Sequence, residues 1–298
     1  MNITLRKLSF LLCFLCFAGN ALAQSHVTSA NDLYTFETIA VEGVDYLAVG
    51  ASSDFEDYAG NTPSPDGERM IGFTLIDGVF KTYDFPGAKN IYFYALGNNG
   101  VAGGYYEDSD GLHHGVIVEN GEMKRYDFPG AVETFIFGYS DSKGIFTGSF
   151  IDESGLRKGF SGDIVIEFPR ARATYADFVN AEGRIVGSFI DEDGLYRSYY
   201  RSPDGRVAIL EYFKPETLEY FFVHGITDSS SLMVLCRAKK EGDVPRTYIG
   251  SFIRGLKELN FPGSVSTEGW NINQDNSVVG HYDTEDGRRH GFVAKRIR

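Results

Sequence analysis

Short apolar and aromatic runs alternate with turn residues along nearly the whole chain. Runs such as Thr134–Tyr139 and Ile145–Ile151 are rich in Phe, Tyr, Ile and Thr, and clusters of Gly, Asp, Asn and Pro separate them. Such runs between turn signals are typical of short β-strands. Beyond the N-terminal segment, no window shows the 3.6-residue period of an amphipathic helix. The pattern therefore predicts an all-β fold.

The strand pattern repeats along the chain. The motif Asp-Phe-Pro-Gly occurs at Asp84–Gly87 and Asp127–Gly130, with diverged forms at Glu167–Arg170, Tyr212–Pro215 and Asn260–Gly263. A second element keeps step with it: an apolar-Gly run, an acidic Gly turn and a Gly-Phe step. Its copies read GVAGGYYEDSDGLHHGV, GIFTGSFIDESGLRKGF, GRIVGSFIDEDGLYRSY and NSVVGHYDTEDGRRHGF, with diverged copies over Met233–Ile249 and Leu47–Phe73. About six copies at a period of roughly 40–48 residues indicate a repeat architecture.

This period favours a β-propeller, because about 44 residues hold four short strands and their turns, which make one blade. The run after Asp-Phe-Pro-Gly would be the first, innermost strand, and the run before the next copy the fourth. The chain ends on a third-strand run, Gly291–Ile297, and Tyr34–Ile39 would supply the missing fourth strand and close the ring. We therefore predict six four-stranded antiparallel blades. Five blades are the alternative, because this closure leaves little chain for an innermost strand in the first repeat.

The repeats resemble the HAF-type extracellular repeat. That family carries DFPGA, a G-I-N-x-x-G-x-I-V-G run and an H-G-F step, which appear here at Asp127–Ala131, Asn271–Gly280 and His290–Phe292. The resemblance covers nearly the whole chain after the N-terminal segment. It departs in the fifth repeat, where the Gly and His steps are lost. The resemblance implies a secreted, β-propeller-like fold and no established chemistry.

The N-terminal segment has the features of a signal peptide. Arg6 and Lys7 precede an apolar run over Leu8–Ala18, and Ala21-Leu22-Ala23 ends the segment with small residues where a signal peptidase cleaves. The apolar run is shorter than the roughly 20 residues that span a bilayer. We predict a signal peptide over residues 1–23, a short linker over 24–33 and one propeller domain over 34–298. The protein would be secreted, to the periplasm or the extracellular medium.

Removing the signal peptide changes the charge and the cysteine count. The formal net charge of −13 becomes −15 without Arg6 and Lys7, and Cys236 is the cysteine that remains. An acidic surface disfavours nucleic acid and anionic membranes as partners. One cysteine cannot form an intramolecular disulfide, so we predict a buried, unpaired thiol and a monomer held together by its core.

Acidic Gly turns follow the second strand of several repeats, and up-and-down blades would place them on one face. The long segment Ser52–Glu68 is predicted to overhang that face. Asp and Gly are also ordinary residues of tight turns, which is the simplest reading of them. The sharper reading is a calcium site at Asp108, Asp152 and Asp191, because carboxylate oxygens bind calcium. The predicted carboxylates of this binding face are Asp108, Asp110, Asp152, Asp191, Asp193 and Asp286.

Three further residues are candidates for the ligand-binding face: Trp270, His224 and His281. The two histidines fall outside the repeating His step that contains His114 and His290, a step that favours packing or turn stabilisation. Trp270 suits core packing or stacking on a sugar ring. No nucleophile elbow, phosphate loop or zinc-protease motif is present.

Two function classes follow. The favoured one is a non-catalytic secreted propeller that binds a glycan, a cell-surface component or a protein through its acidic loop face. The alternative is a hydrolase or lyase acting on a polysaccharide with carboxylates or His at the channel mouth; its catalytic residues are unassigned. Two carboxylates within about 10 Å at the axis would favour a glycosidase.

Overall fold

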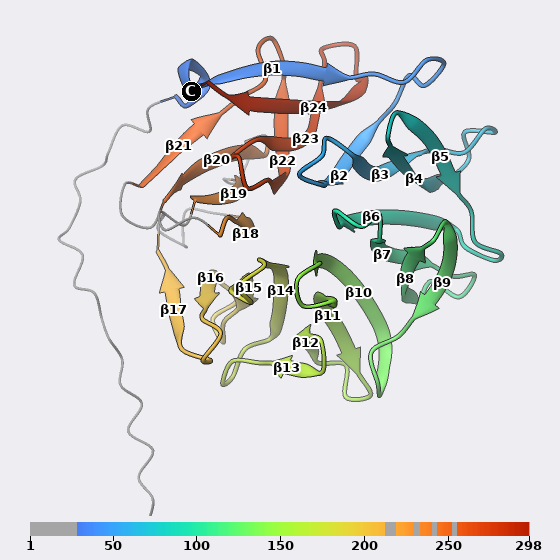
Figure 1. Ribbon diagram of the computed structural model, residues 1–298. Helices are drawn as coiled ribbons and strands as arrows, with labels where there is room; N and C mark the ends of the chain where they lie inside the picture. Colours follow the sequence, from blue (N-terminus) through green and yellow to red (C-terminus); the bar gives the residue numbers. More distant parts are fainter. Residues whose placement is uncertain (1–28, 212–218, 229–232, 240–242, 252–254, 298) are drawn as a thin grey trace, which may run out of the picture.

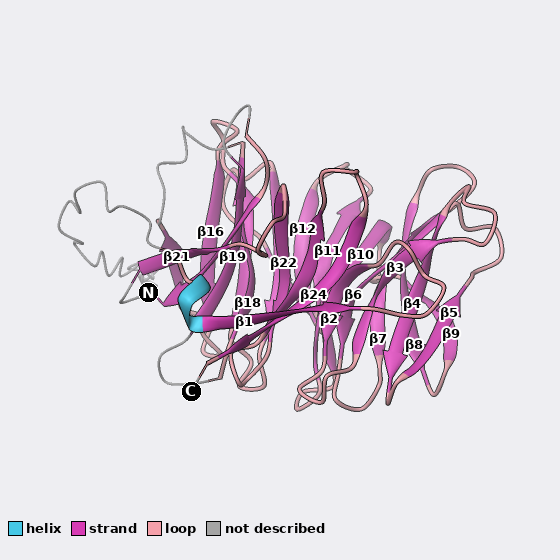
Figure 2. Ribbon diagram, turned by 90° about the horizontal axis from the view of Figure 1, so that it is seen from above, coloured by secondary structure: helices cyan, strands magenta, loops and turns pink. Residues whose placement is uncertain are grey.

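The computed structural model describes residues 29–211, 219–228, 233–239, 243–251 and 255–297, with no side-chain description for 233–237. The predicted signal peptide and the motif at Tyr212–Pro215 lie outside these residues. The described strands form a closed ring of antiparallel sheets around an axis (Figure 1), and their turns gather on two opposite faces (Figure 2). The fold is an all-β propeller, as predicted.

The described residues form one short 3-10 helix, η1 (Asn31–Leu33), and the strands that make up the sheets. The strands are β1 (Tyr34–Ile39), β2 (Ala48–Ser52), β3 (Tyr58–Pro63), β4 (Met70–Ile76), β5 (Val79–Tyr83), β6 (Asn90–Leu96), β7 (Ala102–Glu107), β8 (His113–Glu119), β9 (Glu122–Tyr126), β10 (Ala131–Ser140), β11 (Ile145–Asp152), β12 (Arg157–Ser161), β13 (Ile164–Ile166), β14 (Ala173–Val179), β15 (Ile185–Ile190), β16 (Tyr196–Arg201), β17 (Val207–Leu210), β18 (Tyr220–Ile226), β19 (Met233–Lys239), β20 (Arg246–Ser251), β21 (Gly255–Leu259), β22 (Ser266–Ile272), β23 (Val278–Asp283) and β24 (Arg289–Arg296).

Hydrogen bonding groups the described strands into four four-stranded sheets and one eight-stranded sheet. The larger sheet consists of β10–β13 and β14–β17, joined by a single parallel bridge between Arg157 and Ala173. That bridge forms because β13 is short and covers only Gly159–Ser161 of β12, which leaves Arg157 uncovered. The predicted count of six separate blades is therefore wrong. Five equal blades are not observed either, because one sheet holds eight strands.

The ring closes where β1 pairs with β24. Their register runs from Tyr34 opposite Arg296 to Ile39 opposite Gly291. The N-terminal strand thus becomes the outer strand of the sheet that contains the C-terminal strands, as the sequence predicted. The residues just before β1 bond to the neighbouring sheet, since Ala30 N donates to Glu258 O of β21 at 2.7 Å. Part of the predicted linker over 24–33 is therefore packed against the propeller.

A circle of hydrogen bonds also connects the turns between the first and second strands, which we call the inner turns. In most of these turns a backbone amide donates to the side-chain oxygen of the equivalent residue next along the ring. These bonds are Asp54 N to Asn98 Oδ1 (2.8 Å), Asn98 N to Asp141 Oδ2 (2.9 Å), Ala181 N to Asp228 Oδ1 (3.0 Å), Asp228 N to Gln274 Oε1 (2.8 Å) and Gln274 N to Asp54 Oδ1 (3.1 Å). Ser142 Oγ bonds Ala181 O and completes the circle.

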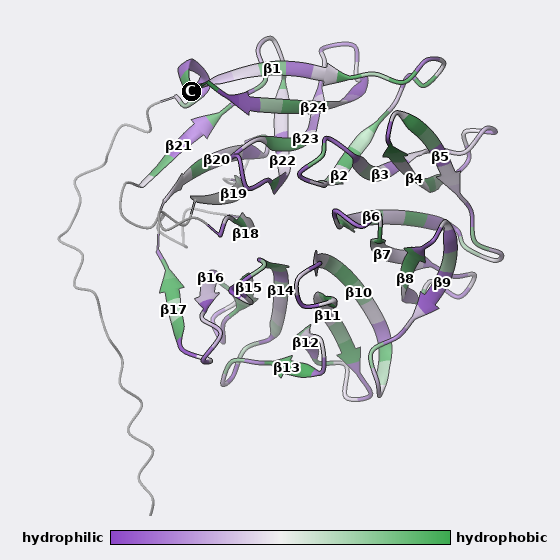
Figure 3. Ribbon diagram, viewed as in Figure 1, coloured by the Kyte–Doolittle hydropathy of each residue, from purple (hydrophilic) through white to green (hydrophobic). Residues whose placement is uncertain are grey.

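The core lies between neighbouring sheets, as in other sheet-on-sheet packings. One cluster joins Val49, Tyr58 and Phe73 of the first sheet to Val279 and Val293 of the last, so the closing junction is packed like the others. At the outer edge, β13 and β17 appear hydrophobic in Figure 3, where Ile164 and Val207 are exposed. Among the described residues, no helix is long and apolar enough to cross a membrane.

The first repeat differs from its prediction. Ser52–Glu68 is not one overhanging loop, because its middle part is β3, which pairs with both β2 and β4. Asp54, Glu56 and Asp57 therefore lie in an inner turn, on the face opposite the acidic turns, and only Asp66 shares the acidic face. The innermost strand that seemed to be missing is β2, whose small residues (AVGAS) are all buried.

Cys236 lies in β19, where its backbone pairs with Val223 and Tyr248. The other sheets have glycine at this position of the register, for example Gly104 opposite Phe93 and Gly280 opposite Gly269. Cys236 thus stands where these strands have glycine. Its thiol is outside the described side chains, so its predicted burial stays a prediction.

Candidate ligand site on the ring axis

Every innermost strand contains a β-bulge at the same place. The register with the second strand shifts between Phe93 and Ala95, between Ile136 and Gly138, and correspondingly in the other innermost strands. A bulge leaves a residue unpaired and re-aims its side chain. The residues inside these shifts are Gly50, Tyr94, Phe137, Ala176 with Asp177, His224 and Trp270.

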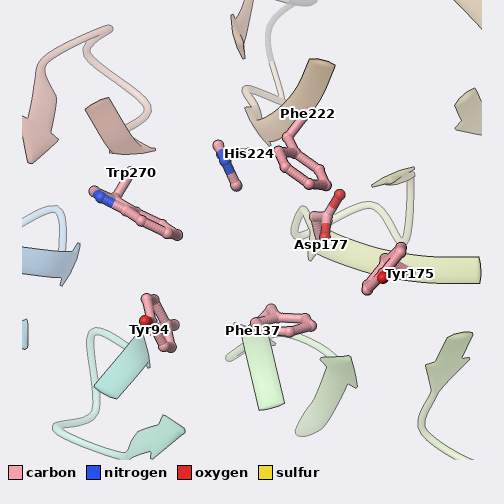
Figure 4. A pocket seen from close by; sticks show the side chains of 7 residues that line it. All are labelled: Tyr94, Phe137, Tyr175, Asp177, Phe222, His224 and Trp270. Atoms are coloured by element: carbon pink, nitrogen blue, oxygen red, sulfur yellow. The ribbon is translucent and has the colours of Figure 1, made fainter. Parts of the chain in front are cut away.

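The bulged residues meet at the axis. Tyr94, Phe137, Asp177, His224 and Trp270 line a cavity of about 130 Å³, together with Tyr175 and Phe222. Figure 4 shows these side chains, which come from β6, β10, β14, β18 and β22 and converge on one space. All except Asp177 are half-buried and keep surface that a ligand can reach. The β2 bulge contributes Gly50 and so adds no side chain to the cavity.

Aromatic rings form most of the cavity wall. The ring centroid of Trp270 lies 4.9 Å from that of Tyr94 and 4.8 Å from that of His224. Phe222 follows at 5.6 Å from His224, and Phe137 lies 6.0 Å from Tyr94. Such a wall presents apolar faces together with a few polar atoms, which is the usual composition of a small-molecule site.

Asp177 is the acidic group of this wall. It is buried, and its Oδ2 accepts a hydrogen bond from Ser188 Oγ at 3.0 Å. The nearby Tyr175 has its pKa raised by burial. His281, on β23, lies just behind Trp270, with its ring centroid 6.1 Å away, and its Nε2 is 3.6 Å from Glu268 Oε1. Of the predicted ligand-face residues, Trp270 and His224 thus line the cavity, and His281 packs behind one of them.

The carboxylates that begin the acidic turns accept hydrogen bonds from backbone amides of their own turns. Asp108 Oδ1 accepts hydrogen bonds from the amides of Asp110 and Leu112, and the glycine of this turn, Gly111, has a φ of 86°. The same pattern recurs in the turns that begin at Asp152 and Asp191. These bonds confirm that Asp and Gly act here as turn-forming residues.

Basic side chains pair with most of these turns. Asp108 Oδ2 is 3.0 Å from His114 Nε2, which supports a turn-stabilising role for that histidine. Asp152 pairs with Lys158 at 3.3 Å, and Asp191 with Arg197 at 2.9 Å. The exposed Asp286 pairs with Arg288 within its own turn.

The calcium prediction at Asp108, Asp152 and Asp191 gains no support from this geometry. Within the described part of the chain, no three His, Cys, Asp or Glu side chains form a group that could hold a metal ion. The side chains of Asp110 and Asp193 are exposed at the tips of their turns.

Sequence reasoning missed Tyr94, Phe137, Tyr175, Asp177 and Phe222. One signal was available: in four repeats the bulged residue stands ten positions before the second-strand glycine. These pairs are Gly50 and Gly60, Tyr94 and Gly104, Asp177 and Gly187, and Trp270 and Gly280. The residue types at this position differ, so the alignment gave no reason to group them.

No family model and no curated protein matches the chain. Solved structures do. AofleA from Arthrobotrys oligospora has a TM-score of 0.54 at 10% identity, over 90% of each chain. The SapL1 lectin, solved in complex with alpha methyl fucoside, has a TM-score of 0.52 at 11% identity, over 85% of this chain and 97% of that one. TolB from Acinetobacter baumannii has a TM-score of 0.50 at 16% identity over 72% of this chain, which spans 57% of TolB. At these identities the likeness establishes the propeller fold.

Proposed function

We propose that this protein is an exported, non-catalytic propeller that binds carbohydrate, with one sugar unit held in the axial cavity. The observation that carries the proposal is the convergence of bulged residues on one cavity walled by aromatic rings. The C–H face of a sugar ring packs on Trp270 and Tyr94, and its hydroxyl groups reach the polar atoms of Asp177 and His224.

The size of the cavity supports a single small unit. A dry cavity of about 150 Å³ accepts a molecule the size of benzene, whereas drug-sized ligands need pockets of about 300–1,000 Å³. A space of about 130 Å³ that remains open to solvent therefore suits part of a sugar ring, with the rest of a glycan outside.

The axial cavity is a better site than the acidic turns. Carboxylates such as Asp152 are already satisfied by turn amides and by basic partners such as Lys158, so a ligand would have to displace these bonds. The aromatic rings at the axis are half-buried and offer ring faces on which a sugar can pack. The SapL1 lectin offers an analogy, since a chain with this fold was solved with a fucoside bound.

The hydrolase alternative is less well supported. Glycosidases of the common type use two carboxyl groups on either side of the scissile bond. Asp177 is the one carboxylate among the described residues that line the cavity. The wall thus provides stacking surfaces and a hydrogen-bond acceptor, which suit binding.

Isothermal titration with a panel of methyl glycosides, including methyl fucoside and methyl glucoside, tests the proposal. We expect binding of at least one sugar with a stoichiometry of one per chain, because the bulged residues form one shared site. Trp270→Ala should weaken it about tenfold, since an aromatic contact contributes about 0.5–1.5 kcal/mol beyond its buried area.

Phe55→Ala is the matched control, because Phe55 is a 70% exposed aromatic residue in an inner turn. It should bind like the wild type. Failure of every sugar to bind would contradict the proposal. So would unchanged affinity in Trp270→Ala, or several equivalent sites per chain.

A further inference from the structure

Arg157 is a basic residue near the axis with an unusual environment. It begins β12, but its side chain extends inward over its own sheet, across Ser149 to Phe135 on the innermost strand. The guanidinium carbon lies 4.1 Å from the centroid of the Phe135 ring and 5.5 Å from that of Tyr175 on the next innermost strand. Its hydrogen bond within the described residues runs from Nη1 to Ser149 Oγ at 2.9 Å.

Arg157 has no carboxylate partner within 4 Å among the described residues. Burial lowers the pKa of Arg157, as expected for a cation without a counterion, and the charge of Glu133 raises it to a smaller extent. Glu133 itself is bound by His113: the Nδ1 of His113 lies 2.6 Å from Glu133 Oε2, and the backbone N of His113 donates to the same oxygen at 3.1 Å. The neighbouring Lys158 on β12 pairs with Asp152. Basic residues at or near the start of other third strands also have partners, in the pairs Arg69–Asp84, His114–Asp108, Arg197–Asp191, Arg246–Glu258 and Arg289–Asp283.

The aromatic rings beside Arg157 orient its guanidinium so that its N–H groups can reach a ligand. The guanidinium lies over the Phe135 ring, and a guanidinium stacked on an aromatic ring keeps the N–H groups along its edges available. Tyr175, one of the two rings, also lines the axial cavity. The same bridge that joins β12 to β14 places Arg157 beside Ala173, two residues before Tyr175. The unpaired cation therefore lies at the border of the cavity.

We propose that the sugar bound at the axis carries a carboxylate, as a uronic acid does, and that Arg157 binds this carboxylate through its edge N–H groups. The inference rests on the proposed function and names its ligand class. Asp177 lies two residues beyond Tyr175 along β14, away from the Arg157 bridge, so it meets the hydroxyl side of the sugar. A planar carboxylate matches the two-donor edge of a guanidinium.

The test compares methyl glucuronide with methyl glucoside, and methyl galacturonide with methyl galactoside, by isothermal titration. We expect the wild type to prefer the acidic member of at least one pair by tenfold or more. Arg157→Gln should lose this preference and still bind the neutral sugar. Arg157→Lys keeps the charge without the two-donor edge, so it should show an intermediate preference.

Arg172→Gln is the matched control, since Arg172 is exposed and bonds the backbone oxygen of Glu192. It should keep the wild-type preference. Equal binding of acidic and neutral sugars by the wild type would overturn this inference and leave the proposed function standing. Retained preference in Arg157→Gln would overturn it too, as would tighter binding of glucose 6-sulfate than of the uronides. If no sugar binds, the proposed function itself fails. Arg157→Lys preserves the positive charge beside Phe135 and keeps the test valid if Arg157→Gln does not fold.

Discussion

At the scale of single residues, a glycine in the second strand of most sheets allows the backbone of that strand to approach the backbone of the innermost strand closely. A Cβ atom built at Gly148 would lie 1.9 Å from the carbonyl oxygen of Phe135, and one at Gly104 would lie 1.8 Å from that of Tyr92. The same contact with the innermost strand recurs at Gly60, Gly187 and Gly280. Because the bulge lies beside this contact, the glycine permits the geometry that turns side chains such as Phe137 toward the axis.

Gly148→Ala should therefore lower the free energy of unfolding by at least about 2 kcal/mol, because backbone atoms must move to admit the methyl group. The melting temperature should fall by about 4–8 °C, which calorimetry can measure. Gly130→Ala is the control: Gly130 has a φ of 77° and open space at its Cβ, so the cost is about 1–2 kcal/mol of backbone strain. A smaller loss in Gly148→Ala than in Gly130→Ala would show that the crowding is easily relieved.

At the scale of elements, each acidic turn is a local hydrogen-bonded structure that joins the second and third strands. In the turn between β11 and β12, the hydrogen bond from Ser154 Oγ lowers the pKa of Asp152 to about 2, with further help from Leu156 N and Lys158. Because this pKa lies below that of an unfolded aspartate, near 3.9, the charged carboxylate stabilises the fold above about pH 4. That stabilisation is lost as the pH falls toward 2.

Asp152→Asn should thus be less stable than the wild type at pH 5 to 7, and the difference should shrink between pH 4 and pH 2. Urea denaturation across this range measures it. Glu153→Gln, at the exposed neighbouring position, serves as the control and should show no such convergence. A difference between Asp152→Asn and the wild type that stays constant down to pH 2 would mean that the turn bonds do not depend on the charge of Asp152.

At the scale of the whole molecule, two separate sets of interactions hold the ring closed. On the rim, β1 pairs with β24, and Phe36 contacts Phe261 in an edge-to-face arrangement at 5.7 Å. Near the axis, the circle of inner-turn hydrogen bonds joins the first sheet to the last through Gln274 and Asp54. Loss of β1 would leave β24 as an unprotected edge while the inner circle remains.

A chain that begins at residue 40 should therefore melt at least about 10 °C below one that begins at residue 29, with a broader transition. It should also associate at micromolar concentration, because an exposed strand edge pairs with other chains. Calorimetry and size-exclusion chromatography measure the two effects. The shorter chain unfolding at the same temperature, as one cooperative monomer, would show that the inner circle alone closes the ring.

Local patterns in the sequence determined much of this architecture. Strand positions such as β10, the role of Gly111 and Gly155 in turns, and the pairing of Tyr34–Ile39 with the last repeat all followed from periodicity and turn chemistry. These features depend on residues close together in the chain, or on one strand completing one sheet. The strands and turns are set by short stretches of sequence, and the closure follows from counting the strands of the incomplete last repeat, so both can be predicted from the sequence.

Only the tertiary structure decided the rest. The bulges bring Tyr94, Asp177 and Trp270 to one cavity although they lie far apart in the chain, and their different residue types hid their common position. The joined sheet and the place of Arg157 depend on how little of β12 the short β13 covers. In the first repeat, β2 and β3 consist largely of small residues, so the sequence pattern did not predict them as strands. The structure shows that both are buried against neighbouring strands. A site shared by many segments is set by their register around the axis, and no single segment of the sequence carries that information.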